Sequence, residues 1–129
     1  MANPIQTRLP APSQPFSWAT HAGSLMFTAH GAVDSAGQIA GADITAQARL
    51  TFDNLVAAVA AAGASMTDVA QVLIYMRDAR DMAAIDVVYR EYFTAPYPNR
   101  ASVAVAGFVH PAMLIEVVAY VHILPKPGV

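Results

Sequence analysis

The sequence predicts an α+β fold with the element order ββαβαββ, in which two helices pack on one face of a mixed sheet. Two observations support this prediction. Apolar residues recur at helical spacing in two stretches, and runs rich in β-branched and aromatic residues lie before, between and after them. The chain has 129 residues, the size of one ordinary domain, so we expect residues 1–129 to form a single domain.

The N-terminal part of the chain is predicted to contain an arm, a pair of strands and a loop. Residues 1–15 contain four prolines and little periodicity, which is typical of an extended arm. Residues 16–19 and 25–29 are predicted to be two short strands joined by a turn at 21–24. The glycine-containing polar stretch 34–42 is predicted to be a loop.

Two helices are predicted in the middle of the chain, with a strand over residues 69–76 between them. The first helix begins after Asp43, because aspartate is a good N-cap, and it ends at Gly63. The second begins near Asp78 or Asp81. It ends before Pro96, because proline cannot continue a helix.

The last two predicted strands, residues 100–107 and 113–124, are almost continuously apolar, which is typical of strands covered on both faces. We expect them to form a hairpin through residues 108–112, with Ser102 opposite Glu116 and Arg100 opposite Val118. Arg100 would then point to the same side of the sheet as Glu116, roughly 7–8 Å away. This expectation depends on the register, because a shift of one residue moves a side chain to the other face.

Composition excludes several classes of protein. Charged residues make up 12% of the chain, about half the ~25% of an average domain, so we expect apolar surface to be covered by self-association. The net charge is −2 and the seven cations are scattered, which argues against nucleic-acid binding. The chain has no cysteine, its N-terminus does not resemble a signal peptide, and its longest apolar run is too short for a membrane span. We therefore expect a cytoplasmic protein.

Glu116 and Arg100 are the first candidates for chemistry. Glu116 is one of only two glutamates and interrupts an apolar strand, where an uncompensated buried carboxylate costs several kcal/mol. In one interpretation, Arg100 holds a substrate carboxylate and Glu116 holds a water molecule or moves a proton beside it. In the other, the two residues only form a structural ion pair, or Glu116 faces solvent.

The four histidines give no comparable signal. His21 and His30 are nine residues apart and His110 and His122 are twelve apart, and neither spacing matches a metal-binding motif. We expect no metal site. His30 is expected in a loop, where it could line a cleft, and a catalytic triad with Ser102 lacks a nucleophile elbow.

Several segments resemble the Rid (YjgF) family, the reactive intermediate deaminases, and they follow one another in that family's order. The Pro98-Asn99-Arg100-Ala101-Ser102-Val103 segment resembles its Pro-x-Arg-[Ser/Ala]-x-Val signature, and Ile115-Glu116-Val117 resembles its last strand. The resemblance covers roughly residues 16–122. The other matching segments are Asp53-Asn54-Leu55 through Ala61-Ala62-Gly63, Asp68-Val69, Tyr75-Met76-Arg77-Asp78, and Asp86-Val87-Val88-Tyr89-Arg90-Glu91-Tyr92-Phe93.

The resemblance implies a chorismate-mutase-like fold assembled as a homotrimer, with clefts between neighbouring subunits. It also implies hydrolysis of 2-imino and enamine acids to 2-oxo acids and ammonia, without a metal or organic cofactor. In this family the arginine that matches Arg100 binds the substrate carboxylate, and the glutamate that matches Glu116 positions the attacking water.

Five features depart from the family's pattern, one of them an extra residue between the matches to Arg100 and Glu116. The family's amino-terminal tyrosine is Phe16 here, and its Ser-Gly-Gln is replaced by Ala29-His30-Gly31. Its asparagine in the second helix is Asp86, and the second glutamate of its last strand is Val118. We expect a cleft that keeps the charged residues but differs in shape. The expected substrate-binding residues are Arg100, Ser102, Phe16, Ala29, His30, Gly31 and Asp86.

Alternative functions remain open at this point. The chain could deaminate a specialised catabolic intermediate of aminomuconate or aminoacrylate type, or it could be a non-catalytic trimer that binds small ligands. An endoribonuclease role, which is ascribed to some relatives, fits poorly with the pI of about 6.0 and the scattered cations.

Overall fold

The computed structural model describes residues 2–124 and has the predicted α+β fold, with one additional short strand formed by the N-terminal arm. Two 3₁₀ turns, Met66–Asp68 and Ala79–Asp81, precede β4 and α2. The helices and strands are β1 (Asn3–Pro4), β2 (Ala19–Ala22), β3 (Leu25–His30), α1 (Ile44–Ala61), β4 (Val69–Met76), α2 (Met82–Tyr92), β5 (Asn99–Ala104) and β6 (Ile115–His122).

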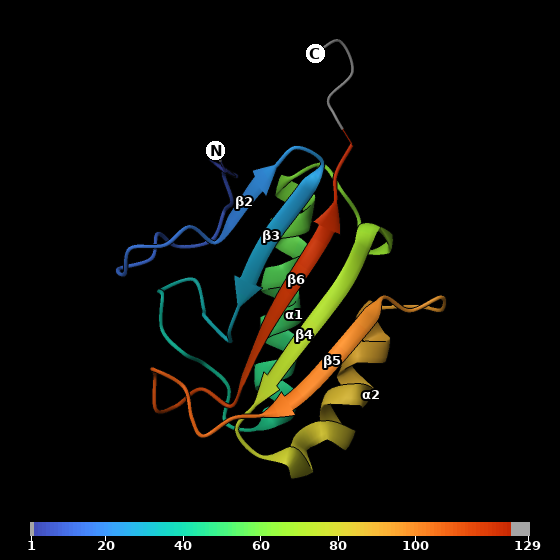
Figure 1. The fold of residues 1–129 in the computed structure, drawn as a ribbon. Helices are drawn as coiled ribbons and strands as arrows, with labels where there is room; N and C mark the ends of the chain where they lie inside the picture. The colour runs from blue at the N-terminus through green and yellow to red at the C-terminus, as the bar shows by residue number, and fades with distance from the viewer. Residues whose placement is uncertain (1, 125–129) are drawn as a thin grey trace.

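The strands form one mixed six-stranded sheet in the order β1-β2-β3-β6-β4-β5. Only β4 and β5 run parallel, and every other neighbouring pair is antiparallel. Both helices lie on the same side of the sheet, behind it in Figure 1, as predicted. Phe52 and Leu55 of α1 are fully buried against the sheet residues Ile74 and Val117.

The predicted helix boundaries are confirmed at the first helix. The Asp43 side chain accepts a hydrogen bond of 2.8 Å from the backbone N–H of Ala46, so it caps α1. Gly63 follows α1 with φ +76°, a conformation that favours glycine. At the second helix, Asp78 caps the 3₁₀ turn that leads into α2.

The first predicted strand is displaced along the chain. Residues 16–18 belong to the arm, where the Trp18 indole N–H donates to the carbonyl of Pro10 at 2.7 Å. Strand β2 lies instead at Ala19–Ala22 because Ala22 pairs with Leu25, which leaves only Gly23 and Ser24 for the turn. The strand is therefore placed by the tight turn with Gly23 at φ +59°.

The predicted hairpin between the last two strands is wrong. Strand β4 lies between β5 and β6 and pairs with both, in parallel with β5 and antiparallel with β6. Ser102 is consequently opposite Ile74, and Glu116 is opposite Tyr75. The physical reason is burial: β4 and β6 each place four residues in the core and β5 places none, so β4 and β6 take positions with a partner on both edges and β5 lies at the edge of the sheet.

The sheet face opposite the helices is apolar, and no element of residues 2–124 covers it (Figure 1). Leu25 and Phe27 of β3 and Val103 of β5 are 37–47% exposed there. Phe27 packs edge-on against Tyr120, with ring centroids 5.6 Å apart. An exposed apolar face of this kind marks a surface that binds another molecule.

Candidate functional site

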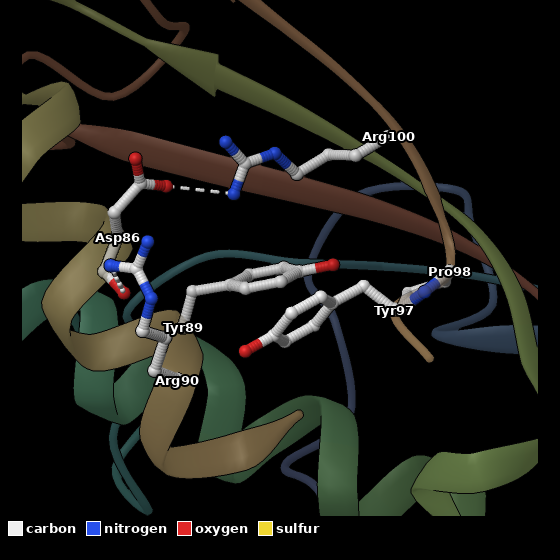
Figure 2. Close-up of a pocket in the computed structure, with 6 residues that line it drawn as sticks. All are labelled: Asp86, Tyr89, Arg90, Tyr97, Pro98 and Arg100. Atoms are coloured by element: carbon white, nitrogen blue, oxygen red, sulfur yellow. Dashed lines mark hydrogen bonds and ion pairs between the residues drawn. The ribbon is translucent and has the colours of Figure 1, made fainter. Parts of the chain in front are cut away.

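The main candidate site is a pocket of about 210 Å³ between α2 and the beginning of β5. Figure 2 shows the Arg100 side chain extending from β5 toward the Asp86 carboxylate on α2, above the ring of Tyr89. The Nη1 group of Arg100 donates to Oδ1 of Asp86 at 2.8 Å, and its guanidinium carbon lies 4.8 Å from the centre of the Tyr89 ring. The lining residues are Asp86, Tyr89, Arg90, Tyr97, Pro98 and Arg100.

Helix geometry explains why α2 presents these side chains together. Asp86 is three residues before Tyr89 and four before Arg90, and residues at these spacings share one side of a helix. The segment from Tyr97 to Pro98 then leads directly into β5, so it closes the other side of the pocket (Figure 2). Burial raises the pKa of Tyr89, whose hydroxyl has no hydrogen-bond partner in the described part of the chain.

Arg100 keeps hydrogen-bonding capacity in this arrangement. A guanidinium has five N–H donors, and only one of them is used by Asp86, with no further partner within residues 2–124. The side chains of Arg100 and Asp86 are 27% and 29% exposed, so solvent and small ligands can reach both. The remaining donors have the fork geometry that binds a carboxylate through two parallel hydrogen bonds.

Glu116 lies elsewhere, on the apolar face of the sheet. It is half-buried on β6 opposite Tyr75, and no residue of the described range 2–124 forms a hydrogen bond or ion pair with its carboxylate. Burial raises the pKa of Glu116 above its ordinary value. A carboxylate with a raised pKa is a stronger base than an ordinary one, which suits it to accept a proton.

Arg100 and Glu116 point to opposite faces of the sheet, which corrects the expectation that they share one face. Arg100 pairs with Val72 of β4, and Glu116 pairs with Tyr75 of the same strand. Paired residues point to the same side, and strand residues an odd number of positions apart point to opposite sides. Within one chain the two do not form an ion pair with each other, because Arg100 pairs with Asp86.

Two of the other predicted residues lie near Glu116. Ala29 pairs with Val118 on the apolar face, and Gly31 directly follows β3. A Cβ atom built on Gly31 would lie 2.7 Å from the Met113 Cε atom and 3.8 Å from the Ile115 carbonyl oxygen, so the backbone approaches the start of β6 closely.

Neither Phe16 nor Ser102 lines the pocket that contains Arg100. Phe16 is 45% exposed in the arm and packs edge-on against Trp18 at 4.9 Å. Ser102 is half-buried on the helix side of β5, two residues after Arg100, and does not line the pocket.

His30 is not in a loop, contrary to expectation, but ends β3 inside the core. Its ring is 1% exposed, its Nε2 atom lies 2.6 Å from the Thr28 hydroxyl, and it stacks on Trp18 at 5.9 Å. Burial lowers the pKa of His30 to about 4. The imidazole therefore stays neutral in the folded protein and does not face the pocket that contains Arg100.

A single chain does not bring the predicted residues into one site. Strand β3, which carries Ala29 and His30, is separated from β5 by β6 and β4. Neighbouring strands are about 4.8 Å apart, so β3 lies roughly 14 Å from β5 across the sheet and β6, which carries Glu116, lies roughly 10 Å from it, with Glu116 on the opposite face from Arg100. The group near Glu116 and the group near Arg100 can therefore meet at one ligand only if a second molecule completes the site.

Sequence reasoning missed the aromatic lining of the pocket. Tyr89 belongs to the hydrophobic core and also lines the space beneath Arg100, together with Tyr97 from the segment before β5 (Figure 2). A signal was present in the sequence, because Tyr89 and Arg90 follow Asp86 at the helical spacings of three and four residues. No helix of the described range is long and apolar enough to cross a membrane.

Comparisons with known proteins agree with this fold. Residues 6–123 match the sequence model of the family described as Endoribonuclease L-PSP. A RutC family protein of Pyrococcus horikoshii is 36% identical over 115 residues, which cover 86% of this chain and 90% of that protein. The 2-iminobutanoate/2-iminopropanoate deaminase of Dermatophagoides farinae is 34% identical over 99 residues, covering 75% of this chain and 77% of that protein. The crystal structure of Escherichia coli TdcF with bound serine superposes with a TM-score of 0.85 and 32% identity, over 93% of this chain and 98% of that chain.

Proposed function

Because this chain belongs to the Rid (YjgF) family, also described as Endoribonuclease L-PSP, we propose that it is a hydrolytic deaminase of 2-imino and enamine acids. The products would be 2-oxo acids and ammonia. The observation that carries the proposal is the Arg100 pocket, where a guanidinium with free donors faces a small, partly aromatic space. The names of similar proteins, a 2-iminobutanoate/2-iminopropanoate deaminase and a TdcF that binds serine, support the same size and class of ligand.

In the proposed reaction, Arg100 binds the substrate carboxylate and thereby fixes the adjacent imine carbon. Water adds to this carbon and forms a carbinolamine, while Glu116 accepts a proton from the water. Glu116 returns this proton to the nitrogen and then accepts the proton of the carbinolamine hydroxyl as the C–N bond breaks. The carbonyl forms, and the departing ammonia takes up the proton from Glu116 to leave as ammonium. No metal or organic cofactor takes part in this scheme.

A homotrimer would supply Arg100 and Glu116 to one cleft from different subunits. The positions of the two residues on opposite faces of the sheet in one chain support this arrangement. The apolar sheet face of Leu25, Phe27 and Val103, together with the 12% charge content, supports assembly through that face. An RNA-cleaving function is less well supported, because the net charge is −2 and the cations are scattered.

The proposed function is tested by measuring imine hydrolysis directly. An amino acid oxidase generates the imine in situ, and semicarbazide traps the imine that remains. We expect the wild-type protein to speed the loss of imine and Arg100→Ala to be inactive. The matched control is Arg80→Ala, because Arg80 is an exposed arginine outside the pocket. A folded wild-type protein that accelerates no imine, or an Arg100→Ala variant as active as wild type, would contradict the proposal.

The shared cleft is tested by mixing two inactive variants. Arg100→Ala and Glu116→Gln subunits are co-expressed with different tags, and mixed oligomers are isolated. If Arg100 and Glu116 of one site come from different subunits, some clefts in the mixture contain both wild-type residues and activity returns. If both residues act from the same subunit, the mixture stays inactive.

A further inference from the structure

Asp86 places a negative charge directly beside the guanidinium that is proposed to bind the substrate carboxylate. Its Oδ1 atom accepts the Arg100 Nη1–H at 2.8 Å, and both side chains line the pocket. Figure 2 shows the second oxygen of Asp86 turned away from Arg100, and it has no hydrogen-bond partner in residues 2–124. The pocket therefore places the Asp86 anion directly beside the Arg100 cation, and Arg90 adds a second cation to the lining.

The Asp86 carboxylate beside the Arg100 guanidinium gives the pocket different affinities for two kinds of small acid. A plain anion such as a 2-oxo acid gains a contact with Arg100 but brings its negative charge close to the Asp86 carboxylate. A zwitterion, with a cationic nitrogen on the carbon next to its carboxylate, finds an opposite charge for each of its own groups. The exposed ring of Tyr97 adds a further attraction for a cation, whereas the Tyr89 ring already carries the Arg100 guanidinium.

We propose that Asp86 is a specificity-determining residue that makes the Arg100 pocket select zwitterionic α-amino and α-iminium acids over 2-oxo acids. This inference rests on the proposed function and specifies the charge state of its substrate. A protonated 2-imino acid carries the required cation beside its carboxylate, whereas the 2-oxo acid product has lost it. Asp86 therefore favours binding of the substrate and release of the product.

The test compares two stable ligands with the same three-carbon skeleton, L-alanine and pyruvate, by isothermal titration calorimetry. Asp86→Asn removes the charge but keeps an oxygen that can accept from Arg100 Nη1, so the position of the guanidinium is preserved. We expect the ratio of the pyruvate Kd to the alanine Kd to fall at least tenfold in Asp86→Asn. Asp86→Glu keeps the charge and should retain most of the wild-type ratio.

The control for a general change of net charge is Asp81→Asn, because Asp81 lies at the start of α2 and does not line the pocket. This control should leave the ratio unchanged. A ratio that stays within twofold in Asp86→Asn, or a wild-type protein that binds neither ligand at millimolar concentration, would overturn the inference. Circular dichroism of each variant establishes that it is folded.

Binding and catalysis separate the two proposals. If the protein hydrolyses imines but the Kd ratio does not change in Asp86→Asn, the proposed function stands and the role of Asp86 in specificity is refuted. If the protein hydrolyses no imine but the Kd ratio falls tenfold in Asp86→Asn, the selectivity of the pocket for zwitterions stands and the proposed reaction is refuted.

Discussion

Gln47 is expected to hold the chain segment that leads into β6, and therefore to influence the placement of Glu116. Its side chain is 2% exposed on α1 and reaches a segment 65–67 residues further along the chain. The Nε2 group donates to the carbonyls of Gly41 at 3.2 Å and Ala112 at 2.9 Å, and Oε1 accepts from the Leu114 N–H at 2.9 Å. Replacement by alanine removes all three hydrogen bonds and leaves their backbone partners without them.

The expected loss of stability follows from these contacts. Each hydrogen bond contributes about 1 kcal/mol, and a buried partner left without a bond adds to the loss. The higher helix propensity of alanine offsets only a few tenths of a kcal/mol of this loss. We therefore expect Gln47→Ala to lower the free energy of unfolding by about 3 kcal/mol, a large part of the 5–15 kcal/mol that is typical of a domain.

Urea denaturation followed by circular dichroism and by Trp18 fluorescence measures this change at one fixed protein concentration, because assembly would make stability depend on concentration. The matched control is Gln38→Ala, since Gln38 is exposed in the loop before α1 and its side chain forms no hydrogen bond within residues 2–124. We expect the control to change stability by less than about 0.5 kcal/mol. A loss below about 1 kcal/mol in Gln47→Ala would refute the reasoning.

Two further predictions concern titratable groups. The pKa of His30 falls from 6.5 to about 4 on folding. Between these two pH values the unfolded chain therefore binds a proton that the folded chain does not. We expect the free energy of unfolding to fall by about 3 kcal/mol as the pH drops from 6.5 to 4. His30→Gln should remove this part of the pH dependence in urea titrations at several pH values; an unchanged profile would contradict a buried neutral His30. The raised pKa of Glu116 has the opposite sign, because its ionised form is penalised on folding as the pH rises. Glu116→Gln should therefore raise the melting temperature at pH 7 while lowering imine hydrolysis at least a hundredfold, and a lower melting temperature would contradict the assigned burial cost.

The sequence predicted those features of the fold that depend on nearby residues. The cap at Asp43 and the stop at Gly63 follow from side-chain and backbone preferences within a few positions, and both are confirmed. The strand at Val69–Met76 was predicted with its observed bounds because its apolar run is long and clearly delimited. The family motifs similarly single out Arg100 and Glu116, because each motif is a short continuous segment.

Strand order and the partner of Arg100 were decided only by the tertiary structure. The apolar segment 100–107 followed by the apolar segment 113–124 suggests a hairpin, but β4 lies between the two strands. The pairing of each strand with β4 places Arg100 and Glu116 on opposite faces of the sheet. Asp86, fourteen residues before Arg100, becomes its ion-pair partner because α2 packs beside β5. Pairings of this kind depend on which surfaces are buried against each other over the whole chain, and no local pattern of residues carries that information.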